Sequence, residues 1–173
     1  MGVLYKKNKL ILEPLIHGGA STTVYRSGTP ALSLAVSAET ALSLATENFD
    51  KRFERVKKLN KDLREFFSGF DCVTVNSPAD AVPHILNISV NGVKATVFQR
   101  MLSEKGVYVS VKSACSSDGT PSRAVYEISK SRKNALSSWR ISLSHLTTDK
   151  EISEFKMIFK NCIDEIFKNT EKK

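Results

Sequence analysis

The chain has 173 residues, 41% of them hydrophobic and 25% charged, so it is long enough to bury the core of one domain. Its formal net charge is +8. It contains no apolar run that could span a bilayer and its first residues lack the pattern of a signal peptide, so we expect a cytoplasmic protein that does not bind membranes.

The first thirty residues predict extended chain and a polar loop. Residues 3–5 and 10–12 have the composition of two short strands around a lysine-rich turn. Residues 17–29, HGGASTTVYRSGT, contain three glycines and no periodicity, which indicates a loop. A lone hairpin is barely stable, so we interpret this segment as the end of a larger sheet.

Two helices are predicted next. Residues 30–49 are rich in Ala, Leu and Ser at helical spacing, and residues 49–66 carry an apolar stripe until Ser68 and Gly69 end it. The opposite face of the second helix mixes acidic residues with seven basic ones: Lys51, Arg52, Arg55, Lys57, Lys58, Lys61 and Arg64. This spacing is typical of a solvated face, although a surface for an acidic partner remains an alternative. No aromatic residues alternate with the basic ones, so we expect no nucleic-acid partner.

The remaining chain alternates strands and helices. We predict strands at 72–75, 84–90, 108–114 and 139–144, and helices at 94–106, at 124–129 and after Thr148, where Thr148 and Glu151 form a capping box. The turns are short and the strand faces alternate apolar with polar residues. The fold class is therefore α+β, with helices packed on a small, mostly antiparallel sheet.

The cysteines and histidines do not indicate a metal site or a disulfide scaffold, because they are scattered: Cys72, Cys115, Cys162, His17, His84 and His145. Cys72 opens a strand and Cys162 lies on the apolar stripe of the last helix, so both are expected to be core residues. Cys115 differs, because VKSACSSDGT surrounds it with small polar residues. A thiol without an apolar wall is either an incidental surface cysteine or a nucleophile, and Lys112 and Arg123 would favour its thiolate form.

Four stretches resemble one enzyme family: HGGASTTVYRSGT (17–29), HILNIS (84–89), SACSS (113–117) and WRISLSHLTTDKEI (139–152). Their order and spacing are similar to those of the C-terminal half of cysteine desulfurases of the iron–sulfur cluster type. These are class V aminotransferase family enzymes that use pyridoxal 5'-phosphate and have the aspartate aminotransferase fold. Three stretches depart from the family pattern: after HGG a third Gly and a Glu are common, and this chain has Ala20, Ser21, Thr22 and Thr23. Lys112 replaces a common Gly, and Thr120-Pro121 replaces Glu-Pro.

The resemblance implies residue roles. Cys115 matches the catalytic cysteine, Arg140 the arginine that binds the substrate carboxylate, and Thr29 the threonine that reaches the phosphate of the partner subunit's cofactor. Arg26 lies in the same motif and is expected to shape the loop. The resemblance also implies that residues 1–29 are a remnant of the large cofactor-binding domain, and that residues 30–173 form the small C-terminal domain.

The function that the resemblance implies is removal of sulfur from L-cysteine, which leaves L-alanine and a persulfide on Cys115. The sulfur then passes to an iron–sulfur scaffold or another sulfur acceptor, and the family implies a homodimer. The lysine that binds the cofactor covalently would precede Met1, so we expect the isolated chain to be inactive and not to bind pyridoxal phosphate covalently. The alternative is a sulfur-carrier or scaffold-binding module without a cofactor.

Overall fold

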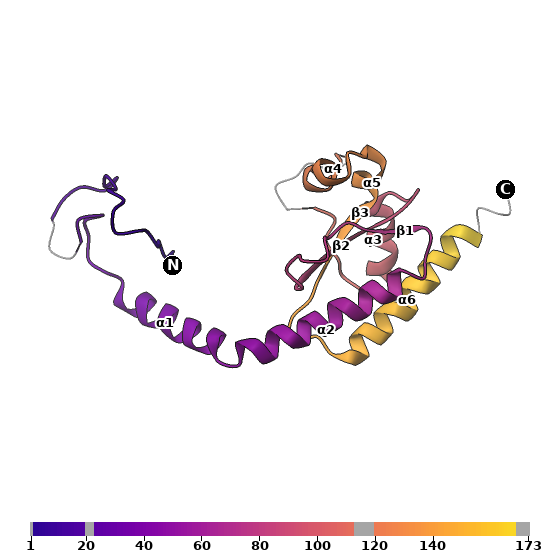
Figure 1. Ribbon diagram of the computed structural model, residues 1–173, viewed down its shortest axis with the longest axis horizontal. Helices are drawn as coiled ribbons and strands as arrows, with labels where there is room; N and C mark the ends of the chain where they lie inside the picture. The colour runs from indigo at the N-terminus through magenta and orange to yellow at the C-terminus, as the bar shows by residue number, and fades with distance from the viewer. Residues whose placement is uncertain (1, 20–22, 113–119, 169–173) are drawn as a thin grey trace. The chain divides into compact units, whose positions relative to one another are not determined.

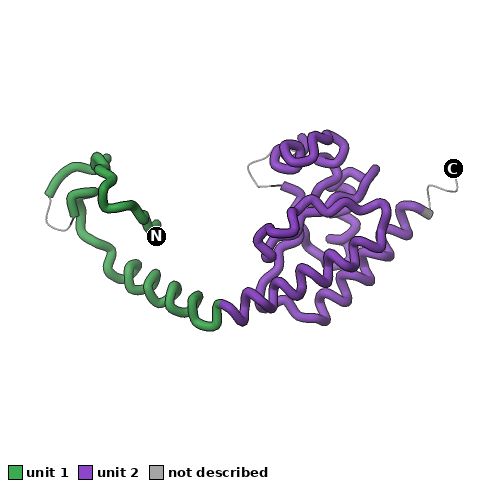
Figure 2. Tube along the Cα trace, in the orientation of Figure 1, with its two compact units in different colours: residues 1–49 green, residues 50–173 purple. Residues whose placement is uncertain are grey.

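The computed structural model describes residues 2–19, 23–112 and 120–168 (Figure 1). The chain divides into two compact units, residues 1–49 and residues 50–173, which have separate colours in Figure 2. This division follows the packing of the chain and does not test whether residues 30–49 belong to a small C-terminal domain. The expected boundary after residue 29 stays a prediction.

The first unit contains an irregular segment and helix α1 (Leu32–Thr46). The strands expected at residues 3–5 and 10–12 are wrong: within the described part of this segment the backbone is irregular, with a turn closed by the Leu10 N–H donating to the Lys7 carbonyl (3.0 Å). No neighbouring strand pairs with these residues there, and a strand without a ladder is not stable. Helix α1 is confirmed, and none of its residues is buried.

The second unit begins with α2 (Phe49–Phe67) and contains a three-stranded sheet. The strand order is β1-β2-β3, formed by β1 (Val73–Val75), β2 (Ile85–Val90) and β3 (Ser138–Ser142). Both pairings are antiparallel, with Val75 opposite Ile88 and Ile88 opposite Trp139. The α+β fold class is confirmed, with helices packed on a small antiparallel sheet.

Four further helices complete this unit: α3 (Ala95–Glu104), α4 (Arg123–Ser129), α5 (Arg132–Ser137) and α6 (Asp149–Lys168). Helix α6 begins at the predicted capping box, where the Glu151 carboxylate accepts from the Thr148 N–H (2.7 Å) and the Thr148 hydroxyl accepts from the Glu151 N–H (3.2 Å). The bond from the Thr148 N–H and a second bond that the Thr148 hydroxyl donates to the same carboxylate (2.8 Å) lower the pKa of Glu151.

Two expectations for this unit need correction. Residues 108–114 do not form a strand over their described part; they contribute a single bridge between Ser110 and Arg140. Helix α5 was not expected from the sequence. Its six residues are too few for a helical period to show, and it is capped by the Ser131 hydroxyl, which accepts from the Asn134 N–H (3.2 Å).

The core lies between one face of the sheet and helices α2, α3 and α6. Leu86, Ile88 and Val90 alternate along β2 and are fully buried. Asn87 and Ser89 therefore face the other side of the sheet, against which α5 packs. One face of the sheet is thus apolar and packs on the core, whereas the other face is polar and can contribute side chains to a binding site.

No helix of the described residues is long and apolar enough to cross a membrane.

Candidate functional site

A cleft of about 690 Å³ lies on the polar face of the sheet. Asn87 of β2 and Arg140 of β3 are opposite each other in the antiparallel register, and both line the cleft. The Ser77–Pro78 loop, residues 110–112 and the start of α4 form its other walls. The cleft is therefore built by segments that are distant in sequence and that the strand pairing brings together.

Arg140 has the environment of an anion-binding side chain. Its backbone is held on both sides, because its N–H donates to the Ser110 carbonyl (2.7 Å) and the Ser110 N–H donates to its carbonyl (3.2 Å). Its Nε atom is buried and has no hydrogen-bond partner among the described residues. A buried charged donor without a partner is unfavourable, so an anionic ligand in the cleft would stabilise it.

A network of amide side chains supports the floor of the cleft. The Asn76 amide donates to the Asn87 side-chain oxygen and to the Ser89 hydroxyl, both at 2.8 Å. Asn134 of α5 donates in turn to the Asn76 side-chain oxygen (2.8 Å), and the Ser89 hydroxyl donates to the Asn134 carbonyl (3.0 Å). The network joins β2 to α5, and it was not anticipated from the sequence because its members are up to 58 residues apart.

Arg64 of α2 holds the Ser77–Pro78 wall of the cleft. Its guanidinium donates to the Ser77 carbonyl (3.0 Å) and the Pro78 carbonyl (2.8 Å), and its Nε donates to the Asn60 side-chain oxygen (2.7 Å). Asn60 is buried and also donates to the Pro83 carbonyl (3.0 Å). Arg64 was expected to belong to a solvated basic face, and the sequence holds no signal for this role because its partners are mostly backbone carbonyls.

We expect Arg64→Gln to lower the free energy of unfolding by about 1.5–3 kcal/mol, because two carbonyls lose a charged donor. Urea denaturation followed by Trp139 fluorescence measures this change. Lys61→Gln is the matched control on the same helix: Lys61 is exposed and its ion pair with Glu65 is 3.7 Å long, so the loss should stay below about 0.5 kcal/mol. Equal losses in the two variants would show that Arg64 is an ordinary surface residue.

Cys115 lies outside the described residues. Lys112 and Thr120, which flank the undescribed segment 113–119, both line the cleft, and the Lys112 Nζ donates to the Thr120 hydroxyl (3.0 Å). Both positions are among the departures from the family pattern noted above. Their hydrogen bond joins the two ends of the segment that contains Cys115.

The other two cysteines are less suited to nucleophilic chemistry. Cys162 is fully buried and Cys72 is half-buried, and burial raises the pKa of both thiols. A raised pKa lowers the fraction of thiolate, which is the reactive form. Cys162 is confirmed as a core residue.

Thr29 belongs to the first unit and is exposed. The preceding Gly28 has a φ of 106°, a conformation that favours glycine, and a Cβ there would meet the Arg26 guanidinium at 3.3 Å. The Arg26 Nε donates to the Ser27 carbonyl (3.1 Å), and the role of Arg26 in shaping this loop stays a prediction. The structure therefore places Arg140 in the cleft, whereas Thr29 lies in the other unit.

The comparisons with known proteins point to a single family. Residues 1–155 match the family described as aminotransferase class-V. Over 99% of its length the chain is 30% identical to the "NifS/IcsS protein homolog" of Lactobacillus delbrueckii subsp. bulgaricus, and over 94% it is 33% identical to "Cysteine desulfurase IscS" of Pseudoalteromonas translucida. It covers 44% and 41% of those two proteins, so it spans less than half the length of the curated relatives it matches.

Solved structures agree. The chain superposes on a "NIFS-LIKE PROTEIN" with a TM-score of 0.76 and 25% identity, covering 92% of this chain and 41% of that one. A NifS-like protein from Rickettsia africae gives a TM-score of 0.73 at 25% identity, covering 90% of this chain and 41% of that one. The fold is shared with these NifS-like proteins over most of the chain.

Proposed function

Because the chain belongs to the class-V aminotransferase family, we propose that it is the C-terminal part of a cysteine desulfurase. The complete enzyme removes sulfur from L-cysteine and passes it from Cys115 to an iron–sulfur scaffold or another sulfur acceptor. Arg140 carries the proposal: it lines the cleft together with both residues that flank the Cys115 segment, and its buried Nε has no hydrogen-bond partner among the described residues. The relatives' names support the same activity.

The residues present fit the cofactor that this family uses. Thr29 offers an exposed hydroxyl beside a glycine, which suits a phosphate, and we propose that it binds the cofactor of the partner subunit in a homodimer. When bound, pyridoxal phosphate supplies the electron sink that bond changes at the substrate α-carbon require. We expect the isolated chain to hold no cofactor covalently.

Arg140 binds and orients the substrate. Its guanidinium forms charge-assisted hydrogen bonds with the cysteine carboxylate, and the backbone bonds to Ser110 hold β3 in place beneath it. Asn87, opposite Arg140 and tied to Asn76, keeps the neighbouring strand in register. The substrate is thereby fixed at its carboxylate end, while its sulfur remains accessible.

Cys115 is the proposed sulfur acceptor. It is three residues along the chain from Lys112, which lines the cleft. The Cys115 thiolate attacks the substrate sulfur, a sulfur–sulfur bond forms, and the carbon–sulfur bond breaks. The electron pair of the broken bond stays on the carbon, which takes up a proton. The product leaves as alanine, and Cys115 retains the persulfide.

A sulfur-carrier module without a cofactor is not favoured. The family match extends over residues 1–155 and includes the RSGT loop, which a carrier would not need. An absorption spectrum and a sulfide assay decide between the desulfurase and the carrier module. The complete enzyme that contains this chain should show the absorption of protein-bound pyridoxal phosphate and should release sulfide from L-cysteine. A complete protein that did neither would contradict the proposal.

We expect Arg140→Lys to lower kcat/KM for L-cysteine by about 10- to 100-fold in the complete enzyme, mainly through KM. A lysine keeps the charge but loses the forked geometry that matches a carboxylate. Steady-state sulfide release in the presence of dithiothreitol measures the change. Arg100→Lys is the matched control, because Arg100 is exposed and lies on α3 away from the cleft lining. Equal kinetics for both variants would show that Arg140 does not bind substrate.

A further inference from the structure

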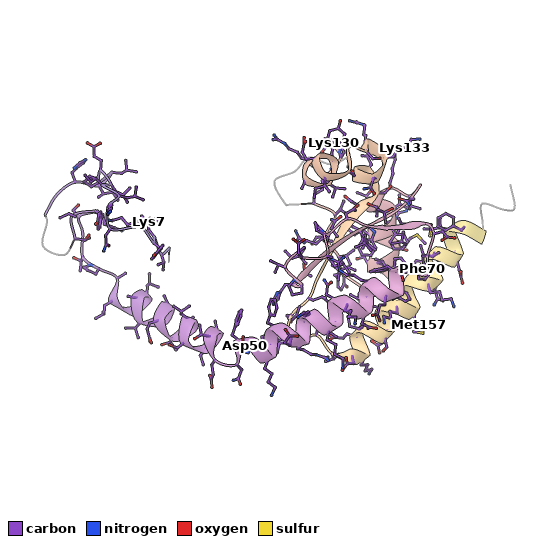
Figure 3. All side chains as sticks on the ribbon, in the orientation of Figure 1. Lys7, Asp50, Phe70, Lys130, Lys133 and Met157 are labelled. Atoms are coloured by element: carbon purple, nitrogen blue, oxygen red, sulfur yellow. The ribbon has the colours of Figure 1, made fainter. Side chains whose placement is uncertain are left out.

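Helices α4 and α5 form a surface with excess positive charge beside the cleft. Residues 120–140 contain five basic residues and one acidic residue, Glu127. Glu127 is paired with Lys130. Arg123, Arg132 and Lys133 are exposed and have no ion pair with another described residue. Figure 3 shows Lys130 and Lys133 on this pair of helices.

The charge on the longer helices is different because neighbouring acids neutralise much of it. Within the described residues, ion pairs that connect basic side chains of α2, α3 and α6 to carboxylates include Arg55–Asp149, Lys57–Glu54, Lys61–Glu65, Arg100–Glu104, Lys150–Glu154 and Lys156–Asp62. On α4 and α5, by contrast, Arg123, Arg132 and Lys133 have no such pair within the described residues, so exposed positive charge lies next to the cleft.

The same surface exposes apolar side chains. Ile128 is 64% exposed and Tyr126 is 40% exposed, whereas Val125 on the same helix is buried and anchors it to the domain. A combination of arginine, tyrosine and an exposed aliphatic residue is typical of the centre of a protein–protein contact. A nucleic-acid surface would instead carry several aromatic rings among its basic residues.

We propose that this surface docks the sulfur acceptor, and that the acceptor presents an acidic face with apolar residues at its centre. The α4–α5 surface is defined by Arg123, Tyr126, Ile128, Lys130, Arg132 and Lys133. Arg123 and Ile128 also line the cleft, and Thr120, five residues from Cys115, lines it too. A protein docked there lies beside the cleft that Lys112 and Thr120 line, and these two residues precede and follow the segment that contains Cys115 in the sequence. The inference rests on the proposed function, because it names the partner of that same site.

The transfer step is an exchange between two thiols. A thiolate of the acceptor attacks the outer sulfur of the Cys115 persulfide, a new sulfur–sulfur bond forms on the acceptor, and Cys115 leaves as a thiolate. No oxidant or reductant is needed. The charge on α4–α5 acts before this step, by raising the local concentration of an acidic acceptor and by orienting it.

The test compares sulfur transfer from the complete enzyme to two cysteine-containing peptides, one rich in glutamate and leucine and the other rich in lysine and leucine. At low salt the glutamate peptide should be the better acceptor by about 10-fold or more, and the preference should fall as salt rises. Arg132→Glu/Lys133→Glu should abolish the preference, and Tyr126→Ala should weaken transfer to the glutamate peptide. Lys51→Glu/Lys160→Glu changes the net charge equally at exposed positions and should keep the preference.

Two results would contradict the proposal that the α4–α5 surface docks the sulfur acceptor. One is an equal loss in both charge-reversed variants, which would mean that only net charge matters. The other combines two observations. Arg132→Glu/Lys133→Glu keeps the peptide preference of the parent enzyme, and single-stranded DNA inhibits sulfur transfer to the peptides equally in both proteins. Sulfide release to dithiothreitol reports on the proposed function separately. If the parent enzyme releases no sulfide, the desulfurase proposal fails. Fluorescence anisotropy of the labelled glutamate peptide then still measures whether the α4–α5 surface binds that peptide.

Discussion

Replacing Cys115 with serine is expected to reduce sulfide release from L-cysteine by at least about a thousandfold in the complete enzyme. A hydroxyl is a far weaker nucleophile than a thiolate and cannot hold a persulfide. The protein-bound sulfur should disappear as well. Incubation with radiolabelled cysteine, followed by electrophoresis without reductant, measures the label directly.

The other two cysteines provide the controls for this prediction. Cys72→Ser and Cys162→Ala should keep the label and most of the activity per folded molecule, because burial raises the pKa of both thiols and neither residue lines the cleft. Label that persists in Cys115→Ser, or that is lost in Cys162→Ala while the protein stays folded, would contradict the assignment of Cys115.

Replacing Phe159 with alanine is expected to lower the free energy of unfolding by about 3–5 kcal/mol. Phe159 is fully buried on α6 and contacts the aromatic rings of six residues: Phe66, Phe67, Phe70, Phe98, Trp139 and Phe155. Removing the ring leaves a cavity that such large neighbours cannot readily fill. Urea denaturation followed by circular dichroism measures the loss.

Met157→Ala is the matched control for this prediction. Met157 lies two residues earlier on the same helix and is 60% exposed, and Figure 3 labels it beside α6. Its replacement should cost less than about 0.5 kcal/mol. A loss for Phe159→Ala no larger than that for Met157→Ala would show that the aromatic cluster does not hold α2, α3 and α6 together.

The sequence predicted the regular elements that have a clear period or cap. The 3.6-residue apolar stripe of α2 and the Thr148–Glu151 box of α6 identified both helices, because the same local contacts that create the pattern also stabilise the helix. Alternation of apolar and polar residues along residues 84–90 identified β2.

Prediction failed where a segment depends on a neighbour. Residues 3–5 and 10–12 have strand composition, yet strand composition cannot supply the partner that a ladder requires. Residues 108–112 pair with β3 only through Ser110 and Arg140. Helix α5 is too short to have a recognisable period and is defined by its cap and by its packing on β2.

For the site, the sequence by itself determined the candidates, because the resemblance to a known family selects Cys115, Arg140 and Thr29 by motif without reference to a spatial neighbour. Only the tertiary structure decided what surrounds Arg140. The antiparallel register places it opposite Asn87, the Ser110 bridge holds its backbone, and Arg64 holds the facing wall through carbonyls 13 and 14 residues away. A cleft is made of such long-range contacts, whose energies depend on packing in three dimensions and leave no periodic trace in the chain.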